Sequence, residues 1–422
     1  MKAGLAGALR DAAPLVARVA QGRSLADELA RVPEEGDTPR AALIDLTHGT
    51  LRAYGRVQFL VRALSHRPSA DPIVDALLWC SLYALDSGRY APYTVVDQAV
   101  RACGLLEKWN AKGYVNAVLR GVLRDAADLE HRSSAEPEAH HRHPAWWIEA
   151  LKRAYPEAWQ SVLSAGNSHP PMTLRVNARR ADALRYVDEL AAASIGARLL
   201  GAQAVLLERA VPVARLPGFA AGAVSVQDAG AQSAAPFLDL HAGQRVLDAC
   251  AAPGGKTGHI LETADVELLA LDSDAARLVR VGENLERLGL AARLAAADCT
   301  DLEAWWDGKP FDRVLADVPC TASGIVRRHP DLKWLRRASD LARFAKRQAA
   351  ILDALWQVLG PGGKLLYVTC SVFPEENEEV VDAFLGRRAD ARRLPLPDGR
   401  AAQRLPDAEQ DGFFYALISR PA

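Results

Sequence analysis

The chain of 422 residues has few cysteines, and they lack the spacing of a disulfide framework or a metal site. None of them forms a C-x-x-C pair. Secreted disulfide-rich domains and zinc modules both need more closely spaced cysteines. We therefore expect reduced thiols, no metal centre and a cytoplasmic protein. The cysteines are Cys80, Cys103, Cys250, Cys299, Cys320 and Cys370.

Long hydrophobic runs and an excess of either charge are also missing. The longest apolar stretch, 76–84, lies between Asp75 and Asp86 and is far shorter than the roughly 20 residues of a membrane-spanning helix. The N-terminus shows no apolar segment before a cleavage site, so we predict neither a membrane contact nor a signal peptide. The formal net charge is −1, so any nucleic-acid-binding surface must be local.

The length predicts two or three domains, at roughly 150 residues for each. Residues 1–127 repeat apolar positions at helical spacing and predict an all-α bundle. The polar stretch 128–143 lacks periodicity and is interpreted as a linker. Residues 144–238 predict a small α+β module. A last domain, 239–422, has the pattern of an α/β fold.

Strand-like and helix-like segments can be placed within the last two domains. The α+β module has strand patterns at 172–176, 204–207 and 223–226, and a helix pattern at 181–193. The α/β domain has strand patterns at 245–249, 267–272, 292–297, 312–317 and 363–369, and helix patterns at 255–264, 273–288 and 338–359. This alternation predicts a mainly parallel, Rossmann-like sheet covered on both faces. Ligands bind beyond the carboxyl ends of such strands.

The stretch 246–257 is the most informative part of the α/β domain. An apolar run ends in Asp248, and the glycine pair 254–255 leads into a helix. Glycine permits a close approach to a ligand, and a helix N-terminus offers N–H donors to an anion. Asp272 ends the next strand about 20 residues later, where a carboxylate binds ribose hydroxyls. We therefore predict a nucleoside-containing cofactor. The motif G-x-G-x-x-G is absent, which disfavours a dinucleotide cofactor.

Other strand ends add chemistry but leave alternatives open. Cys320 and Cys370 close two further strands, although a single cysteine is commonly a small buried hydrophobe and an Asp at a strand end can cap a helix. Residues 250–257 read C-x-x-x-x-G-K-T, one residue away from a phosphate-binding P-loop. The missing first glycine removes the sharp turn around the phosphates. A P-loop ATPase remains an alternative at this point.

A set of motifs resembles the RNA (cytosine-5-)-methyltransferases of the Sun family. The motifs are DACAAPGGKT (248–257), LD (271–272), Asp298, DVPCTASG (317–324) and YVTCSVFPEENE (367–378). The N-terminal half resembles a NusB-like RNA-binding domain, in 42–46, 94–100 and 113–120. The resemblance covers nearly the whole chain and implies a class I methyltransferase domain. A non-catalytic RNA-binding, antitermination-like module is a further alternative, disfavoured because both cysteines are present.

The resemblance implies S-adenosylmethionine-dependent methylation of carbon 5 of a cytosine in small-subunit ribosomal RNA. It assigns Cys370 as the nucleophile, Cys320 to product release and Asp317 to the cytosine. The residues it assigns to the cofactor are Cys250, Ala251, Ala252, Pro253, Gly254, Gly255, Lys256, Asp272, Asp298 and Asp317. One departure is Ala231, where the family commonly has serine.

The segment 327–347 contains eight Lys or Arg against two Asp. It directly follows the Pro-Cys loop, so we predict that it contacts RNA phosphates, with Trp334 either stacking on a base or packing. The residues assigned to RNA are Arg327, Arg328, Lys333, Arg336 and Arg337. We expect a monomer acting on naked RNA or an early ribosomal particle, with the target base unstacked. The histidines at 140, 141 and 143 do not predict a metal site.

Overall fold

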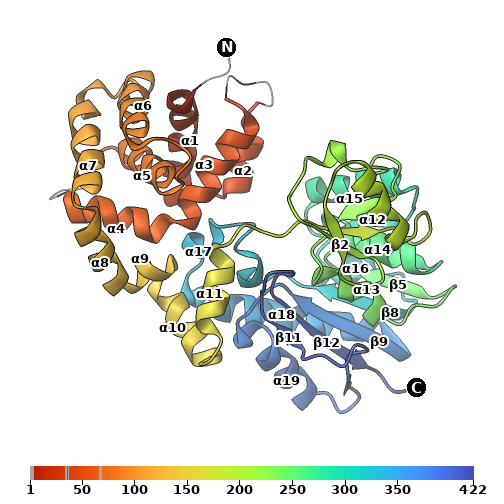
Figure 1. The fold of residues 1–422 in the computed structure, drawn as a ribbon. Coiled ribbons are helices and arrows are strands. Elements are labelled where there is room, and N and C mark those ends of the chain that lie inside the picture. Colours follow the sequence, from red (N-terminus) through yellow and green to blue (C-terminus); the bar gives the residue numbers. More distant parts are fainter. Residues whose placement is uncertain (1–3, 34–35, 37, 66–68) are drawn as a thin grey trace. The chain divides into compact units, whose positions relative to one another are not determined.

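The computed structural model describes residues 4–33, 36, 38–65 and 69–422 (Figure 1). The first three residues of the predicted helical domain lie outside this described part. Contacts divide the chain into two compact units. The helical unit comprises Met1–Ser168 together with Val326–Ala338, and the sheet unit comprises His169–Ile325 and Ser339–Ala422. A short segment from the C-terminal half of the sequence is therefore part of the helical unit.

Helices α1 to α7 build the core of the helical unit. They are α1 Leu5–Ala20, α2 Leu25–Ala30, α3 Arg40–Arg52, α4 Tyr54–Leu64, α5 Pro72–Asp86, α6 Pro92–Leu105 and α7 Lys112–Arg124. Their apolar positions recur at helical spacing, so each helix buries one face in a common core. Asp71 caps α5 by accepting a hydrogen bond from Ile73 N–H, and a proline occupies the first turn. The predicted bundle is confirmed.

The predicted linker, 128–143, is wrong, because the chain stays helical there. Helices α8 (Ala126–Ala135) and α9 (Pro137–His141) cover it, followed by α10 (Ala145–Ala154) and α11 (Trp159–Asn167). Helix α8 buries only Leu129 and Ser133, so its apolar periodicity is too weak to read. Trp147 and Ile148 of α10 are buried. In the described part of the chain, none of the helices has the length and apolar character of a membrane span.

The sheet unit begins with a small antiparallel sheet. Its strands are β1 Thr173–Val176, β2 Ala197–Leu199, β3 Ala204–Leu207 and β4 Val224–Val226, in the order β2-β3-β1-β4. Helix α12 (Ala183–Ala192) packs on the sheet through Tyr186 and Leu190. The prediction located β1, β3, β4 and α12, but it missed β2. That strand has three residues, none of them buried, at the edge of the sheet.

The second sheet is mainly parallel and has the order β10-β12-β9-β8-β5-β6-β7, with β11 beside β12. The strands are β5 Arg245–Asp248, β6 Glu267–Asp272, β7 Arg293–Ala296, β8 Phe311–Asp317, β9 Leu359–Thr369, β10 Arg392–Leu394, β11 Gln403–Arg404 and β12 Phe413–Ser419. Strands β5 to β9 run parallel to one another, as predicted. Strand β12 pairs antiparallel with β9 and was not predicted.

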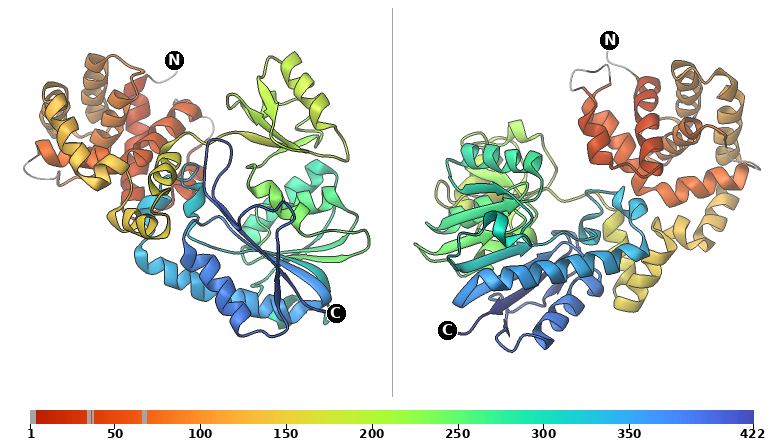
Figure 2. Two further views of the ribbon diagram at one scale, coloured as in Figure 1. Left: turned by 60° about the horizontal axis from the view of Figure 1, so that its bottom comes forward. Right: turned by 180° about the vertical axis from the view of Figure 1, so that it is seen from behind.

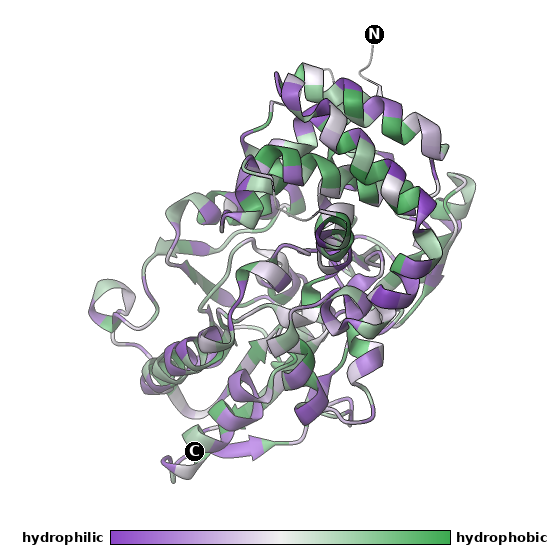
Figure 3. Cartoon of the chain, turned by 90° about the vertical axis from the view of Figure 1, so that its left-hand side faces the viewer, coloured by the Kyte–Doolittle hydropathy of each residue, from purple (hydrophilic) through white to green (hydrophobic). Residues whose placement is uncertain are grey.

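Helices cover both faces of this sheet (Figure 2). One face buries side chains of α18 (Ala338–Val358) and α19 (Glu378–Gly386). The opposite face buries α13 (Ala234–Phe237), α14 (Gly255–Thr263) and α15 (Ala275–Leu288). Successive residues of a strand alternate between the two cores. Along the helices, hydrophobic and hydrophilic residues alternate, as the colours of Figure 3 show. The predicted α/β class is confirmed.

Candidate active site

The predicted site residues meet where the strand order reverses. Strand β5 lies between β6 and β8, so the loops that follow β5 and β8 leave the sheet side by side. Asp248 ends β5 and Asp317 ends β8. Cys320 lies three residues beyond β8, and Cys370 follows β9 directly. A reversal of this kind is where open α/β sheets bind their ligands.

The loop between β5 and α14 has a fixed shape. Gly254 has a φ of +96°, and a Cβ at this position would lie 3.1 Å from the Val281 Cα. Any larger residue would therefore be strained by its conformation and by its neighbour. Asp272 Oδ2 accepts a hydrogen bond of 3.0 Å from Ala252 N–H. The carboxylate predicted to bind ribose thus also ties the loop to β6.

Asp248 is buried and bonded within the site. Its Oδ2 accepts a 2.7 Å hydrogen bond from the Thr257 hydroxyl, while its Oδ1 is buried with no hydrogen-bond partner. Burial raises the pKa of Asp248 to about 7, which the Thr257 hydroxyl partly opposes and the Asp317 charge reinforces. The Thr257 hydroxyl therefore donates its hydrogen bond to Asp248, whereas the threonine hydroxyl of a P-loop coordinates a metal ion.

Lys256 forms an ion pair with Asp317. Its Nζ lies 2.6 Å from Asp317 Oδ2, and both side chains are largely shielded from solvent. Burial on its own lowers the pKa of Lys256, but the Asp317 carboxylate outweighs burial and the pKa is raised. The loop that follows β5 is in this way joined to the end of β8. The Lys256 ammonium group is thus paired with a carboxylate of the same chain, in the position where a P-loop lysine would bind a phosphate.

Cys320 and Cys370 come together as predicted. Their Sγ atoms are 3.4 Å apart. Cys320 is buried and Cys370 is partly exposed. The hydrogen bond with Cys370 and then burial raise the pKa of the Cys320 thiol well above its usual range, and the negative charges of Cys370 and Glu376 add to the effect. The raised pKa favours a protonated Cys320, which would donate to the sulfur of Cys370.

Asp298 is bound by Arg347, a residue that the sequence analysis does not place at the cofactor site. The guanidinium of Arg347, on α18, binds both Asp298 oxygens, and the Thr300 hydroxyl donates to Oδ1 at 2.7 Å. Burial raises the pKa of Asp298, but the bonds from Thr300 and Arg347 outweigh it and the pKa is lowered. Asp298 is thus held as a charged group beyond β7. Arg347 was read only as part of the basic run.

Arg175 is a structural residue that no sequence pattern predicts. Both its nitrogens Nε and Nη2 bind the Glu262 carboxylate, at 2.9 and 2.8 Å, and both side chains are buried. Its Nη1 donates to Gly255 O at 2.8 Å. Strand β1 of the small sheet is thereby fixed to the first residue of α14. In the neighbouring segment 227–232, Gln232 donates to the carbonyls of Leu174 and Gln227.

The predicted RNA-contacting run contains residues that are buried in the helical unit. Lys333 is 0% exposed and Arg327 is 2% exposed. Lys333 Nζ donates to Arg52 O, Arg142 O and Asn167 Oδ1, at 3.1, 2.9 and 3.0 Å. A phosphate contact by these two side chains is therefore wrong for this structure. Arg328 and Arg336 are partly buried and Arg337 is exposed, so their role stays a prediction.

Trp334 packs inside the helical unit. Its ring meets Tyr54 edge to face at 5.1 Å, and its Nε1 donates to Leu51 O at 2.8 Å. Of the two predicted roles of Trp334, packing and base stacking, the structure shows packing. His143 is buried with its Nδ1 2.7 Å from His141 O. No group of His, Cys, Asp or Glu suited to a metal occurs among the described residues.

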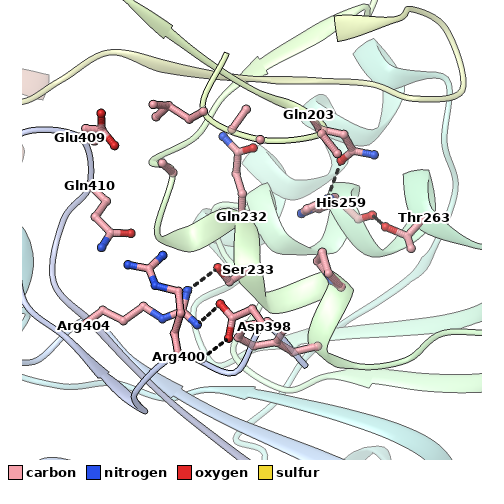
Figure 4. A pocket seen from close by; sticks show the side chains of 17 residues that line it. Gln203, Gln232, Ser233, His259, Thr263, Asp398, Arg400, Arg404, Glu409 and Gln410 are labelled. Atoms are coloured by element: carbon pink, nitrogen blue, oxygen red, sulfur yellow. Dashed lines mark hydrogen bonds and ion pairs between the residues drawn. The ribbon is translucent and has the colours of Figure 1, made fainter. Parts of the chain in front are cut away.

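A cavity of about 430 Å³ lies elsewhere in the sheet unit (Figure 4). His259 and Thr263 of α14 line one side, and Gln203 lies 3.0 Å from the His259 Nε2. Arg404 donates to Ser233 and to Asp398 on the opposite side. The two cysteines at the strand ends are not among the lining residues. This cavity is therefore separate from the predicted site.

The residues beyond β5, β6 and β7 fit a nucleoside bearing an amino-acid group. The start of α14 supplies backbone N–H groups for a carboxylate. Asp272 and Asp298 supply acceptors beyond the next two strands, and Asp248 Oδ1 is an acceptor with no partner. No glycine occupies position 250, so the loop lacks the first turn of a P-loop. The donors and acceptors match S-adenosylmethionine better than a nucleoside triphosphate.

A parallel sheet with this strand order, a glycine turn after its first strand and acidic strand ends define a class I methyltransferase. Comparison with known proteins identifies the group within that class. Family models match at 235–419 (16S rRNA methyltransferase RsmB/F), 143–214 (RsmF/B-like ferredoxin-like domain) and 10–124 (NusB family). The Pseudomonas putida ribosomal RNA small subunit methyltransferase B is 44% identical, over 99% of this chain and 98% of its own. The chain belongs to the RsmB family of RNA methyltransferases.

Two solved structures are similar in fold. The crystal structure of PH0851 has a TM-score of 0.81 at 22% identity and covers 100% of both chains. A methyltransferase homolog protein from Pyrococcus horikoshii has a TM-score of 0.57 at 27% identity, over 66% of this chain and 99% of its own. The Rossmann-like methyltransferase fold and the NusB-like helical domain are thus confirmed.

Proposed function

We propose that the protein methylates carbon 5 of a cytosine in small-subunit ribosomal RNA through a covalent cysteine adduct. The observation that carries this proposal is the pair of cysteines, Cys320 and Cys370, with Sγ atoms 3.4 Å apart at the ends of neighbouring strands. The family supports ribosomal RNA as the substrate. Two thiols fit a reaction in which one adds to the base and the other assists its release.

Carbon 5 of cytosine is a weak nucleophile until a thiolate adds to carbon 6. The Cys370 Sγ forms a bond to carbon 6, and the electron pair of the ring double bond moves toward carbon 5 and the ring nitrogen. Bound S-adenosylmethionine would supply the methyl group that carbon 5 accepts. Loss of the proton from carbon 5 then restores the double bond and breaks the bond to Cys370. Partial exposure of Cys370 fits the attacking role.

Cys320 and Asp317 have complementary roles around the ring. Cys320 holds its proton, because its pKa is raised by the bond with Cys370 and by burial. During release it would pass this proton to the departing Cys370 sulfur and take up the proton that carbon 5 loses. Asp317 accepts from Lys256 through Oδ2, which leaves Oδ1 for the cytosine. Lys256 fixes the carboxylate and places a positive charge on the side where the Cys370 thiolate develops.

We assign the cofactor to the loop between β5 and α14 and to the acids beyond β6 and β7. Ala251, Ala252 and Pro253 shape this loop, while Cys250 borders it together with Lys256. Asp272 would hold the ribose and Asp298 the adenine side. The ATPase alternative is not favoured, because Lys256 is paired with Asp317 and Thr257 with Asp248. No metal enters the proposed reaction.

The proposed enzyme acts on an unstacked cytosine, either in naked RNA or in an early ribosomal particle, as a monomer. The NusB-like helical unit and the exposed arginine at 337 are the proposed RNA contacts. All six cysteines are free in the structure, which supports the proposal that the enzyme works in the reducing cytoplasm.

Alanine variants of the two cysteines test the proposal. Cys370→Ala should lower methyl transfer by at least about a thousandfold, because no thiolate remains to add to carbon 6. Cys320→Ala should accumulate a covalent protein–RNA complex, since addition proceeds and release fails. Incorporation of labelled methyl groups into ribosomal RNA and a denaturing gel give the two readouts. Cys103→Ala, at a buried cysteine of the helical unit, is the control and should behave as wild type.

The adduct also decides which cysteine does what. A complex formed by Cys370→Ala but not by Cys320→Ala would reverse the two roles. Methylation that persists at wild-type rate in Cys370→Ala would exclude covalent catalysis by this residue. Bisulfite sequencing of ribosomal RNA from a deletion strain would then identify the target cytosine.

A further inference from the structure

Glu376 is a fully buried carboxylate beside the cysteine pair. It lies in a short 3-10 turn, Pro374–Glu376, between β9 and α19. Its relative exposure is 0%. Its side chain accepts hydrogen bonds from Thr321 N–H at 2.8 Å, from the Ser371 hydroxyl at 2.6 Å and from Gln348 Nε2 at 3.2 Å, and the Thr321 hydroxyl bonds it as well. Donors from two loops and a helix therefore converge on one side chain.

Two of the donor residues, Thr321 and Ser371, are next to the reacting cysteines in the chain. Thr321 directly follows Cys320, and Ser371 directly follows Cys370. Gln348 of α18 also donates to Pro319 O at 3.0 Å, just before Cys320. The loops after β8 and β9 are thus bound to the same two oxygens. A shift of Glu376 would change the separation of the two Sγ atoms.

The charge of Glu376 is not cancelled by an ion pair in the described part of the chain. Its donors are an amide N–H, two hydroxyls and a side-chain amide, all neutral. Burial raises the pKa of Glu376, and the hydrogen bonds from Ser371 and Thr321 partly offset this. A buried anion beside Cys320 disfavours a second negative charge on that sulfur.

The remaining titratable groups around the pair come from four other elements. Lys256 on α14 and Asp317 at the end of β8 pair with each other, and Asp248 ends β5. Tyr367 on β9 is buried and donates from its hydroxyl to Glu376 O at 2.7 Å. The cation of this set is associated with Cys370, and the uncompensated anion with Cys320. The two sulfurs therefore have electrostatically different surroundings.

We propose that Glu376 is a positioning residue that holds the two cysteine loops together and keeps the proton on Cys320, so that Cys370 is the nucleophile. It touches neither the base nor the cofactor in this proposal. It acts through Thr321 and Ser371 on the sulfurs beside them. The inference rests on the proposed covalent reaction, because it explains why the two thiols would have different roles.

Thiol labelling of Glu376→Gln is the decisive experiment. The variant keeps the size of the side chain and removes its charge. In the full-length protein without RNA or S-adenosylmethionine, iodoacetamide labelling of Cys320, followed by peptide mass spectrometry, should rise about tenfold at pH 8. The pH of half-maximal labelling should fall by about one unit. An unchanged labelling profile would overturn the proposal.

Kinetics give the second readout. Glu376→Gln should lower kcat at least about a hundredfold and leave the KM for S-adenosylmethionine within about twofold, since the cofactor loop is untouched. Ser371→Ala removes one donor but keeps the charge, so it should lower kcat without moving the Cys320 labelling profile. A kcat for Glu376→Gln within about threefold of wild type would contradict the inference.

Two further variants complete the test. Glu379→Gln changes an exposed carboxylate on α19 and should match wild type in both readouts. If Glu376→Gln fails to fold, Glu376→Asp keeps the charge and shortens the side chain, so kcat should fall while the Cys320 profile stays in place. Full activity of Glu376→Asp and Ser371→Ala would overturn the proposal. The labelling needs no substrate, so it remains informative if the RNA assignment fails.

Discussion

Asp248 is a buried carboxylate whose charge changes near neutral pH. Its folded pKa of about 7 lies above its ordinary value of 3.8, because burial disfavours the anion. A group whose folded pKa is raised stabilises the fold at pH values below its unfolded pKa. That contribution is lost as the pH rises through the folded pKa. The contribution of Asp248 to the stability of the sheet unit should therefore decrease as the pH rises from about 4 to about 7.

Replacement by Asn tests this expectation. Asp248→Asn keeps an acceptor for the Thr257 hydroxyl and cannot ionise. Between pH 5 and pH 8 the unfolding free energy of the variant should fall less steeply than that of wild type, by up to about 3 kcal/mol. Urea denaturation of the ligand-free protein at both pH values measures it. Parallel pH profiles for the two proteins would show that Asp248 does not titrate in this range.

Single residues differ in how far the sequence can predict them. Asp248 and Asp272 end strands, and the two cysteines follow strands closely, so the strand pattern alone places them at one edge of the sheet. Arg175 and Arg347 could not be predicted in this way, because their partners are 87 and 49 positions away. The motif 367–378 contains Glu376, but only the fold shows that its donors come from both cysteine loops.

At the scale of elements, the segment Val326–Ala338 has the largest effect on the interpretation. Its charged residues suggest a solvated, RNA-facing run, yet Lys333 and Arg327 are enclosed by helices of the helical unit. Burial lowers the pKa of Lys333 well below its usual range, and the charges of Arg52 and Arg142 reinforce this. Side-chain type alone could not reveal this, since lysine is almost never buried without a charged partner.

Salt-dependent RNA binding separates a packing lysine from a phosphate-binding arginine. Lys333→Ala should leave the slope of binding against salt unchanged and lower the unfolding free energy of the helical unit by about 2 to 4 kcal/mol, through a cavity and lost hydrogen bonds. Arg337→Ala, at an exposed position, should reduce the slope by about 0.7. A reduced slope for Lys333→Ala with unchanged stability would restore the phosphate contact.

Other elements show where patterns fail. The five parallel strands are apolar runs bounded by turns, so they were predicted within a few residues. Strand β12 is an equally apolar run at 413–418, so the sequence contains a signal for this strand, although the prediction lacks it. Helices α8 and α9 bury so few apolar side chains that their stretch reads as a linker. Strand β2 is too short and exposed to produce a pattern.

At the scale of the whole molecule, the two units have separate cores, and the sheet unit contains the residues proposed to bind the cofactor. Heating should therefore give two transitions in calorimetry, one for each unit. S-adenosylhomocysteine at a hundred times its Kd should stabilise the sheet unit by about 2.7 kcal/mol and leave the other transition in place. Loss of Asp272, as Asp272→Ala, should abolish that shift. A single transition that moves as a whole would show that the units unfold together.

The exchange of Val326–Ala338 between the units has a consequence for dissecting the protein. The chain passes from one unit to the other after Ser168, Ile325 and Ala338. A fragment ending at residue 168 would lack Trp334 and the neighbouring side chains of Val326–Ala338, which fill the interior of the helical unit. The complementary fragment would expose these same side chains. In energetic language this stretch is a resident peptide ligand of the helical unit, covalently supplied by the loop that carries Cys320.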